Sequence, residues 1–391
     1  MPEPTRVPST HLPLTVYVHL PWCVRKCPYC DFNSHAGQPD EQRYVDALIR
    51  DLDFELQSRT QWPRVQAVFF GGGTPSLFSG EAIARIVAAL HQRLDIADDT
   101  EITLEANPGT ADAAHFAGYR RGGVNRLSIG VQSFDDAQLR QLGRIHTASA
   151  AQHAYALARE AGFDNINLDL MHGLPGQGFA QAMDDLERAI ELRPEHISWY
   201  QLTIEEGTAF AQHPPELPDN DAQADIEDAG LARLTRAGYR RYEVSAFAQT
   251  GRRAAHNLNY WRFGDYLGLG AGAHGKLSFS QGVRRRARLR SPQKYMAGAG
   301  SAAALARESW PDAQELISEF ALNTLRIDGA FSRARFERTT GLDFAVLSPA
   351  INEACALGLM RTKENQITRT PLGRRHLNRL LECFAEISAF Q

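Results

Sequence analysis

The chain has 391 residues, 43% of them hydrophobic and 23% charged, a balance that argues against the disordered and membrane-spanning classes and allows two or three folded domains. Its 42 Lys and Arg against 46 Asp and Glu give a net charge of −4, which argues against a broad basic surface for nucleic acid. The opening MPEPTRVPSTHLPL lacks the basic and apolar regions of a secretory signal, so we expect a cytoplasmic protein that is not an integral membrane protein.

Short apolar, β-branched runs alternate with helical patterns from Thr15 to about Phe247. The runs are VYVHL, VQAVFF, EITLEA, RLSIGV, NINLDLM and HISWYQLTI, and a further run, YEVSAF, follows near Tyr242. Strands separated by helices form parallel sheets, so residues 1–250 are predicted to adopt an α/β fold whose six units form a closed or partly closed barrel. Chemistry in such folds sits at the carboxyl ends of the strands.

The sequence changes character after residue 250. Residues 251–309 are rich in Gly and Arg, as in GDYLGLGAGAHG and GVRRRARLR, and are predicted to form a connecting region. In residues 310–391, helical segments precede two short strands around Met360 to Thr370 and a last helix. Three helices with a small β-wing resemble a winged-helix module, so we expect an α+β domain at this end of the chain.

Three of the five cysteines lie within the eight residues C-V-R-K-C-P-Y-C, as Cys23, Cys27 and Cys30. This spacing is too crowded for a secreted disulfide framework and indicates a metal site in a reducing compartment. Three thiolates on one loop suit a 4Fe-4S cluster and leave one iron without a protein ligand. Zinc, with His35 as the fourth ligand, is the alternative.

CxxxCxxC directly after a strand resembles the signature of the radical S-adenosylmethionine (SAM) superfamily. More narrowly, Y-V-H-L-P-W-C and C-P-Y-C-D-F resemble the oxygen-independent coproporphyrinogen III oxidases and their relatives, from about Thr15 to the C-terminus. The resemblance implies a radical SAM barrel, a partial TIM barrel, with S-adenosyl-L-methionine on the open iron. There an electron from the cluster can cleave the sulfonium to a 5′-deoxyadenosyl radical. The cofactor carries this chemistry and the protein positions it.

The resemblance also assigns residues to the cofactor. The G-G-G-T-P motif after the second run matches the family's binding motif and contributes Gly72, Gly73 and Thr74, because glycines allow close backbone approach. Polar residues near the ends of later strands match positions that contact the methionine, ribose or adenosyl parts: Glu105, Gln132, Arg144 and Asp169. Tyr17 and Tyr29 match aromatic positions beside the cluster. The alternatives are structural hydrogen bonds, an Arg144–Glu105 ion pair, and core packing of the tyrosines.

A second motif, H-N-L-N-Y-W, begins at His256. An imidazole can ligate haem iron, and aromatic rings can stack on a porphyrin. The motif resembles a hallmark of the haem-chaperone branch of the family, where it is linked to haem binding; a packed, hydrogen-bonded histidine is the alternative. The arginines between Arg284 and Arg290 could bind the propionates of a porphyrin by charge-assisted hydrogen bonds. A solvent-exposed face of a hairpin is the more typical interpretation of such a run.

Two departures favour the chaperone branch over the oxidases. The oxidases have CxxxCxxCxC, whereas Phe32 replaces the last cysteine here, and only 16 residues precede Tyr17, where the oxidases have a longer arm that helps cover the substrate. We therefore predict a protein that binds haem and delivers it to acceptor proteins, such as those of the respiratory chain, and we assign no catalytic residue. The oxidase itself, and a nucleic-acid-binding protein that uses the winged-helix-like module, are the alternatives.

Overall fold

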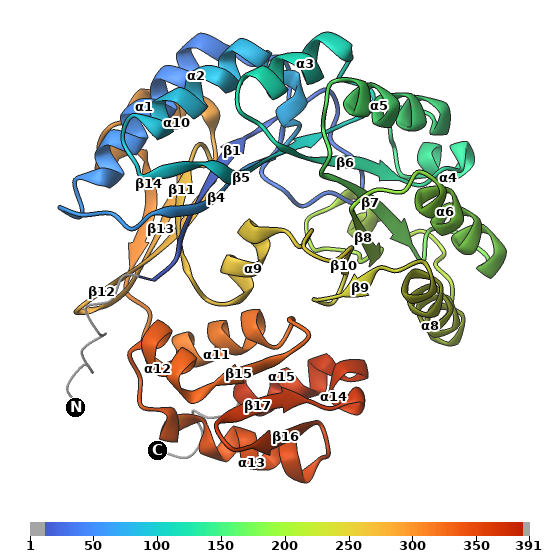
Figure 1. Cartoon of the computed structure of the whole chain (residues 1–391), viewed down its shortest axis with the longest axis vertical. Helices are drawn as coiled ribbons and strands as arrows, with labels where there is room; N and C mark the ends of the chain where they lie inside the picture. Colours follow the sequence, from blue (N-terminus) through green and yellow to red (C-terminus); the bar gives the residue numbers. More distant parts are fainter. Residues whose placement is uncertain (1–11, 386–391) are drawn as a thin grey trace.

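A curved sheet of twelve strands is the centre of the computed structural model, which describes residues 12–385 (Figure 1). The strand order is β14-β13-β12-β11-β1-β4-β5-β6-β7-β8-β10-β9. Six neighbouring strands are parallel and coincide with the six predicted runs, which confirms the predicted α/β fold. They are β1 (Leu14–Leu20), β4 (Val65–Gly72), β5 (Ile96–Ala106), β6 (Arg126–Gln132), β7 (Ile166–His172) and β8 (His196–Gln201).

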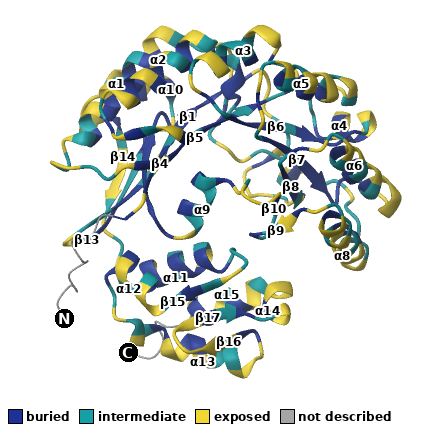
Figure 2. Ribbon diagram, in the orientation of Figure 1, coloured by how far each residue is buried: buried dark blue, intermediate teal, exposed yellow. Residues whose placement is uncertain are grey.

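Helices cover the convex side of this sheet and turn their apolar faces towards it (Figure 2). They are α1 (Glu41–Leu56), α2 (Gly80–His91), α3 (Ala113–Arg121), α4 (Asp136–Gln141), α5 (Ala148–Glu160), α6 (Phe179–Glu191) and α8 (Asn220–Arg236). A short α7 (Ala209–Gln212) lies instead by the cysteine loop, where the N–H of Phe210 donates to the Pro28 carbonyl oxygen over 3.0 Å. Side-chain caps fix several of their starts: Ser79 accepts from the N–H of Ala82, and Asp219 from that of Ala222. The concave side of the sheet is thereby left for the site.

The barrel is incomplete after β8. The run YEVSAF leads into β10 (Ala246–Ala248), which pairs with β8 in the antiparallel direction and with β9 (Arg240–Arg241). Only the first half of β8, His196 to Ser198, is paired in this ladder. Beyond the bond from the Trp199 N–H to the Ser245 carbonyl oxygen, the rest of β8 has no partner strand on that side among the described residues.

The segment predicted as a connecting region, residues 251–309, extends the same sheet. It contributes β11 (Asp265–Leu269), parallel to β1, followed by the antiparallel strands β12 (His274–Phe279), β13 (Gly282–Arg288) and β14 (Leu305–Ser309), with α9 (Ala255–Trp261) and α10 (Pro292–Gly298). Helix α9 lies on the concave side of the sheet (Figure 1).

The arginine run of this segment lies largely inside the protein. Strand β13 holds the run, and Arg288 is buried with its Nε 2.9 Å from an oxygen of Asp51 on α1. Arg284 is buried too and donates to Glu55 over 2.9 Å. Carboxylates far away in the sequence neutralise the run, so these two side chains pack inside the protein and do not form the solvated hairpin face that the charges indicated.

The C-terminal module has the predicted winged-helix-like composition of helices and a small antiparallel sheet. Its elements are α11 (Ala313–Thr324), β15 (Ala330–Ser332), α12 (Arg333–Thr340), α13 (Ser348–Ala356), β16 (Met360–Lys363), β17 (Gln366–Arg369), α14 (Pro371–Arg375) and α15 (Leu377–Ala385). It has a hydrophobic core of its own, which Phe263 joins from the loop after α9. Within residues 12–385 no helix is long and apolar enough to cross a membrane.

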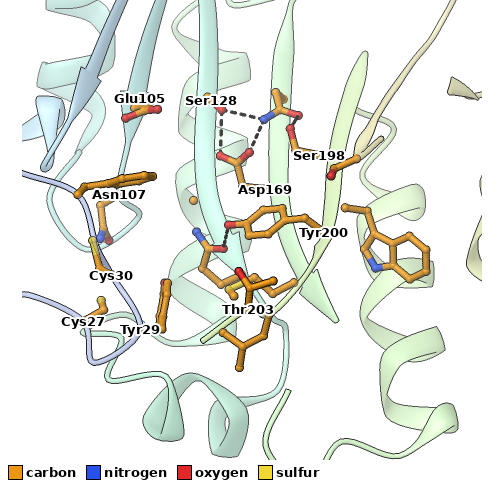
Figure 3. A pocket seen from close by; sticks show the side chains of 18 of the residues that line it. Cys27, Tyr29, Cys30, Glu105, Asn107, Ser128, Asp169, Ser198, Tyr200 and Thr203 are labelled. Carbon is orange, nitrogen blue, oxygen red and sulfur yellow. Dashed lines mark hydrogen bonds between the residues drawn. The ribbon is translucent and has the colours of Figure 1, made fainter. Parts of the chain in front are cut away.

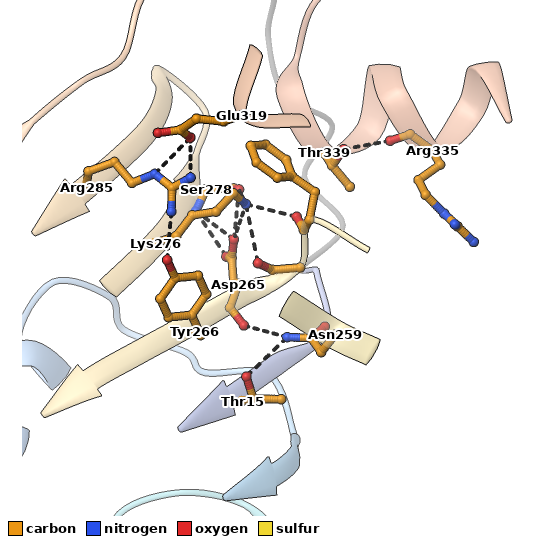
Figure 4. A network of polar contacts seen from close by, with 12 residues as sticks. Thr15, Asn259, Asp265, Tyr266, Lys276, Ser278, Arg285, Glu319, Arg335 and Thr339 are labelled. Carbon is orange, nitrogen blue, oxygen red and sulfur yellow. Dashed lines mark hydrogen bonds and ion pairs between the residues drawn. The ribbon is translucent and has the colours of Figure 1, made fainter. Parts of the chain in front are cut away.

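Polar contacts join this module to the sheet (Figure 4). Arg285 of β13 donates from Nε to Glu319 of α11 over 3.1 Å. Beside it, Lys276 is almost fully buried and contacts Asp265 over 3.3 Å, and burial lowers its pKa to about 8. The Arg285–Glu319 ion pair, which is partly exposed, thus links the module to the sheet beside this buried pair.

Candidate cofactor site

A cavity of about 920 Å³ opens on the concave side of the barrel strands (Figure 3). This volume is near the upper end of the roughly 300–1,000 Å³ that small-molecule sites occupy. It is lined by most of the residues predicted to bind the cluster and the cofactor: Cys23, Cys27, Tyr29, Cys30, Gly72, Gly73, Thr74, Glu105, Gln132, Arg144 and Asp169. Tyr17 and His256 are not among the lining residues. The first eleven residues of the expected short N-terminal arm lie outside the described residues.

The cysteine loop leaves the end of β1 and passes through a short parallel pair, β2 (Trp22–Cys23) with β3 (His35–Ala36). The hydroxyl of Thr74 donates to the sulfur of Cys23 over 3.3 Å, and Arg144 Nη1 lies 3.7 Å from the sulfur of Cys27. Burial raises the pKa of the Cys23 thiol. Hydrogen-bond donors therefore already face two of the three sulfurs, as thiolate ligands require.

The donor set fits an iron–sulfur cluster better than zinc. Within residues 12–385, no three His, Cys, Asp or Glu side chains converge as the ligands of a single ion would. A 4Fe-4S cluster needs no such convergence, because each thiolate binds a different iron. His35, the fourth ligand of the zinc alternative, instead places its Nε2 3.1 Å from the carbonyl oxygen of Arg290 and 3.3 Å from Asn33 Oδ1.

The G-G-G-T-P motif brings the end of β4 against the cysteine loop. Gly72 has a φ of +121°, and its N–H donates to Glu105 Oε2 over 3.1 Å. A Cβ atom on Gly73 would lie 2.5 Å from the carbonyl oxygen of Trp22, closer than backbone allows. Glycine is therefore required here by close backbone packing, as well as by the left-handed conformation at Gly72.

Two carboxyl groups on barrel strands, Glu105 of β5 and Asp169 of β7, line the cavity without an ion-pair partner among the described residues. Burial, and the neighbouring Asp169, raise the pKa of Glu105 to about 8. Burial also raises the pKa of Asp169, although Ser128 and Asn167 donate to its oxygens over 2.9 and 2.8 Å. Carboxylates in such surroundings are stabilised by a cationic ligand, and S-adenosylmethionine is one.

Arg144 and Gln132 complete the wall next to the cysteines. Arg144 does not form the alternative ion pair with Glu105; its Nη2 donates to the carbonyl oxygen of Gly130 over 3.0 Å. Gln132 has a φ of +69°, which is unusual for a residue other than glycine, and its side-chain oxygen accepts from the Tyr200 hydroxyl over 2.7 Å. Strained backbone of this kind is concentrated at functional sites.

Tyr17 and His256 lie behind the cavity wall. The Tyr17 hydroxyl is 2.9 Å from His19 Nδ1. The His256 ring stacks on Phe69, with 5.1 Å between centroids, and it is Phe69 that lines the cavity. His256 Nδ1 has no hydrogen-bond partner, and burial lowers the imidazole pKa to about 3. The H-N-L-N-Y-W motif reaches the cavity through Asn257 and Trp261 instead.

The cavity also contains polar residues that the sequence analysis did not identify: Arg126, Ser128, Asn167, His196, Ser198 and Tyr200. They share a simple pattern, because strand residues two positions apart face the same side of a sheet. Counting back in twos from Gln132 leads to Ser128 and Arg126, and from Asp169 to Asn167. The two-residue period of a strand, counted back from its predicted carboxyl end, would therefore have identified these three residues.

Comparison with known proteins identifies the family. The Radical SAM superfamily model matches residues 17–189. The "Heme chaperone HemW" of Escherichia coli (strain K12) is 48% identical over 375 residues, which cover 95% of this chain and 98% of that protein. The chain belongs to the HemW family of radical SAM proteins. The "Heme chaperone HemW" of Haemophilus influenzae is 47% identical over 378 residues, which cover 95% of this chain and 98% of that protein.

Among solved structures, coproporphyrinogen III oxidase (HemN) from Escherichia coli, described as a radical SAM enzyme, superposes with a TM-score of 0.81. It is 25% identical, and the match covers 96% of this chain and 91% of that one. Membership of the HemW family confirms the predicted branch, and the radical SAM superfamily implies a 4Fe-4S cluster and S-adenosylmethionine as cofactors. The likeness to HemN confirms the barrel and its continuation into the C-terminal module.

Proposed function

We propose that this HemW-family protein is a haem chaperone. It binds haem as well as the 4Fe-4S cluster and S-adenosylmethionine, and it transfers haem to acceptor proteins in the cytoplasm, including proteins of the respiratory chain. The observation that carries the proposal is the similarity to proteins named haem chaperones over nearly the full length of both chains. Phe32, in place of the oxidases' further cysteine, supports the same branch.

In this proposal Cys23, Cys27 and Cys30 hold the cluster, and S-adenosylmethionine completes the open iron. The backbone from Gly72 to Thr74 approaches the methionine group, and polar and aromatic side chains surround the rest of the cofactor: Tyr17, Tyr29, Glu105, Gln132, Arg144 and Asp169. When bound, the cluster and S-adenosylmethionine supply one-electron chemistry, and we assign them a regulatory or assembly role in haem delivery.

His256 is the proposed haem ligand. Its unpartnered Nδ1 and neutral imidazole support this role, since iron binds the neutral ring. Because the ring stacks on Phe69 and does not line the cavity, haem ligation requires the Phe69 side chain to move aside.

The experiment is a haem titration of anaerobically reconstituted protein, followed by addition of apomyoglobin as an acceptor probe. We expect a Soret band on the protein that is lost as haem passes to the probe. His256→Ala should weaken the band, whereas the exposed control His213→Ala should leave it unchanged. Undiminished binding by His256→Ala would remove His256 from the site.

The second candidate function is that of the oxidase, and the structural likeness to HemN favours it. It predicts 5′-deoxyadenosine and a decarboxylated porphyrinogen when coproporphyrinogen III is supplied under dithionite. Turnover of that substrate, without a Soret band in the haem titration, would replace the chaperone proposal by the oxidase.

A further inference from the structure

Arg126 is a buried cation that lines the cavity. It is the first residue of β6, its side chain is only 2% exposed, and it faces the barrel interior at the end of the strand opposite Gln132. Its Nη1 donates to the Thr103 hydroxyl over a long 3.4 Å, and its Nε has no partner. The guanidinium is thus almost without polar contacts of its own.

No carboxylate among the described residues forms an ion pair with this guanidinium, although burial raises the pKa of Asp169 and the positive charge of Arg126 opposes that rise. Asp169, the carboxylate on the neighbouring strand, already accepts from Ser128 and Asn167. Glu101 accepts from the N–H groups of Ala255 and His256, over 3.0 and 3.2 Å, at the start of α9. A buried charge is unfavourable unless it is paired, so a guanidinium left free on a cavity wall indicates an anionic group of a ligand.

Several other arginines that could serve a carboxylate ligand already have polar partners. Arg284 and Arg288 of β13 pair with Glu55 and Asp51, as described above. Within the cavity, Arg326 lies 3.6 Å from Glu243, and Arg144 donates to a backbone carbonyl oxygen. Arg25 and Arg144 also line the cavity without a carboxylate partner, but they lie at the cysteine loop. Arg126 is the unpaired guanidinium at the opposite end of β6.

Other residues that line the cavity indicate the rest of the ligand. Aromatic side chains of Phe69, Phe247 and Trp261 line the same cavity, together with the amide of Asn257. Such a wall suits a flat apolar ring system that carries a carboxylate at its edge. Two residues of this wall come from the H-N-L-N-Y-W motif.

We propose that Arg126 binds a carboxylate of the porphyrin, that is, a propionate of haem. This inference rests on the proposed haem-chaperone function and adds the position of the haem edge. The other source of a carboxylate is the methionine group of S-adenosylmethionine, which belongs at the cysteine loop. Arg126 and Gln132 lie at opposite ends of β6, about 20 Å apart at roughly 3.3 Å per residue, so a carboxylate held at the cluster is too distant from Arg126.

The test is a titration of reconstituted wild-type protein and Arg126→Gln with haem, with haem dimethyl ester, which has no free carboxylate, and with S-adenosylmethionine. We expect the wild type to bind haem about 10- to 100-fold more tightly than the ester, and Arg126→Gln to lose that preference while its ester affinity stays unchanged. Arg121→Gln, which changes an exposed arginine at the end of α3, is the matched control and should behave as wild type.

Each other outcome overturns the inference. Haem binding by Arg126→Gln at wild-type strength would leave the chaperone proposal intact and remove Arg126 from the haem site. Absence of any Soret band in the wild type would remove the chaperone proposal and this inference together. A selective loss of S-adenosylmethionine binding would assign the carboxylate to that cofactor. Should Arg126→Gln not fold, equal affinity of the wild type for haem and its ester would still contradict the assignment.

Discussion

Glu105 couples the cofactor cavity to the pH dependence of folding. Its pKa is about 8 in the folded protein, against an ordinary value of 4.5, because of burial and the nearby Asp169. Between these two values the folded chain holds a proton that the unfolded chain has lost, so stability falls as pH rises through the window. Glu105→Gln removes this titration and retains an acceptor for the N–H of Gly72.

For the cluster-free protein we therefore expect the free energy of unfolding to fall by on the order of a few kcal/mol from about pH 5 to about pH 8, and to fall less in Glu105→Gln. Urea denaturation at both pH values measures this. Glu191→Gln, at the exposed end of α6, is the control and should retain the wild-type slope. Equal slopes in all three proteins would show that Glu105 ionises normally.

At the scale of elements, the contact between β4 and the cysteine loop determines whether three thiols can hold a cluster. Gly73→Ala would place a Cβ atom 2.5 Å from the Trp22 carbonyl oxygen, so the loop must move. We expect the variant to fold but to bind less than half of the wild-type iron and sulfide after anaerobic reconstitution, which elemental and sulfide assays measure. Gly178→Ala, where the nearest atom is 3.7 Å from the new Cβ, should reconstitute fully. Full reconstitution of Gly73→Ala would mean that the loop tolerates the shift.

Elements could be predicted from the sequence where each carries its own pattern. The parallel strands were predicted because their apolar runs recur between helical segments, and the cysteine loop because three soft ligands lie close together in the sequence. Strand β13 could not be predicted in this way, because its arginines are neutralised by Asp51 and Glu55, which lie more than two hundred residues away in the sequence. The orientation of α9 was equally hidden: a short helix leaves open whether His256 or its neighbours Asn257 and Trp261 face the cavity.

At the scale of the whole molecule, the C-terminal module forms part of the cavity wall. Arg326, from the turn after α11, lines the cavity, lies 3.6 Å from Glu243 and has its guanidinium 4.7 Å from the centre of the Trp261 ring. The next residue, Ile327, forms a backbone bridge with Glu243. Separation of the module from the barrel would therefore also remove a charged group from the site.

Phe263 is the apolar anchor of this arrangement. It is 1% exposed, its ring meets that of Phe320 edge to face at 5.7 Å, and Lys276 Nζ lies 4.4 Å from the ring centre. Phe263→Ala would leave a void between barrel and module, which costs about 3–5 kcal/mol for a buried phenylalanine. Because the module has a core of its own, we expect this variant to unfold in two steps where the wild type unfolds in one.

Calorimetry resolves the two steps. The control is Phe179→Ala, which changes a residue that is 51% exposed and should retain a single transition. A single transition at the wild-type midpoint in Phe263→Ala would mean that the ion pairs alone hold the module, since a lost anchor must otherwise appear as lost cooperativity.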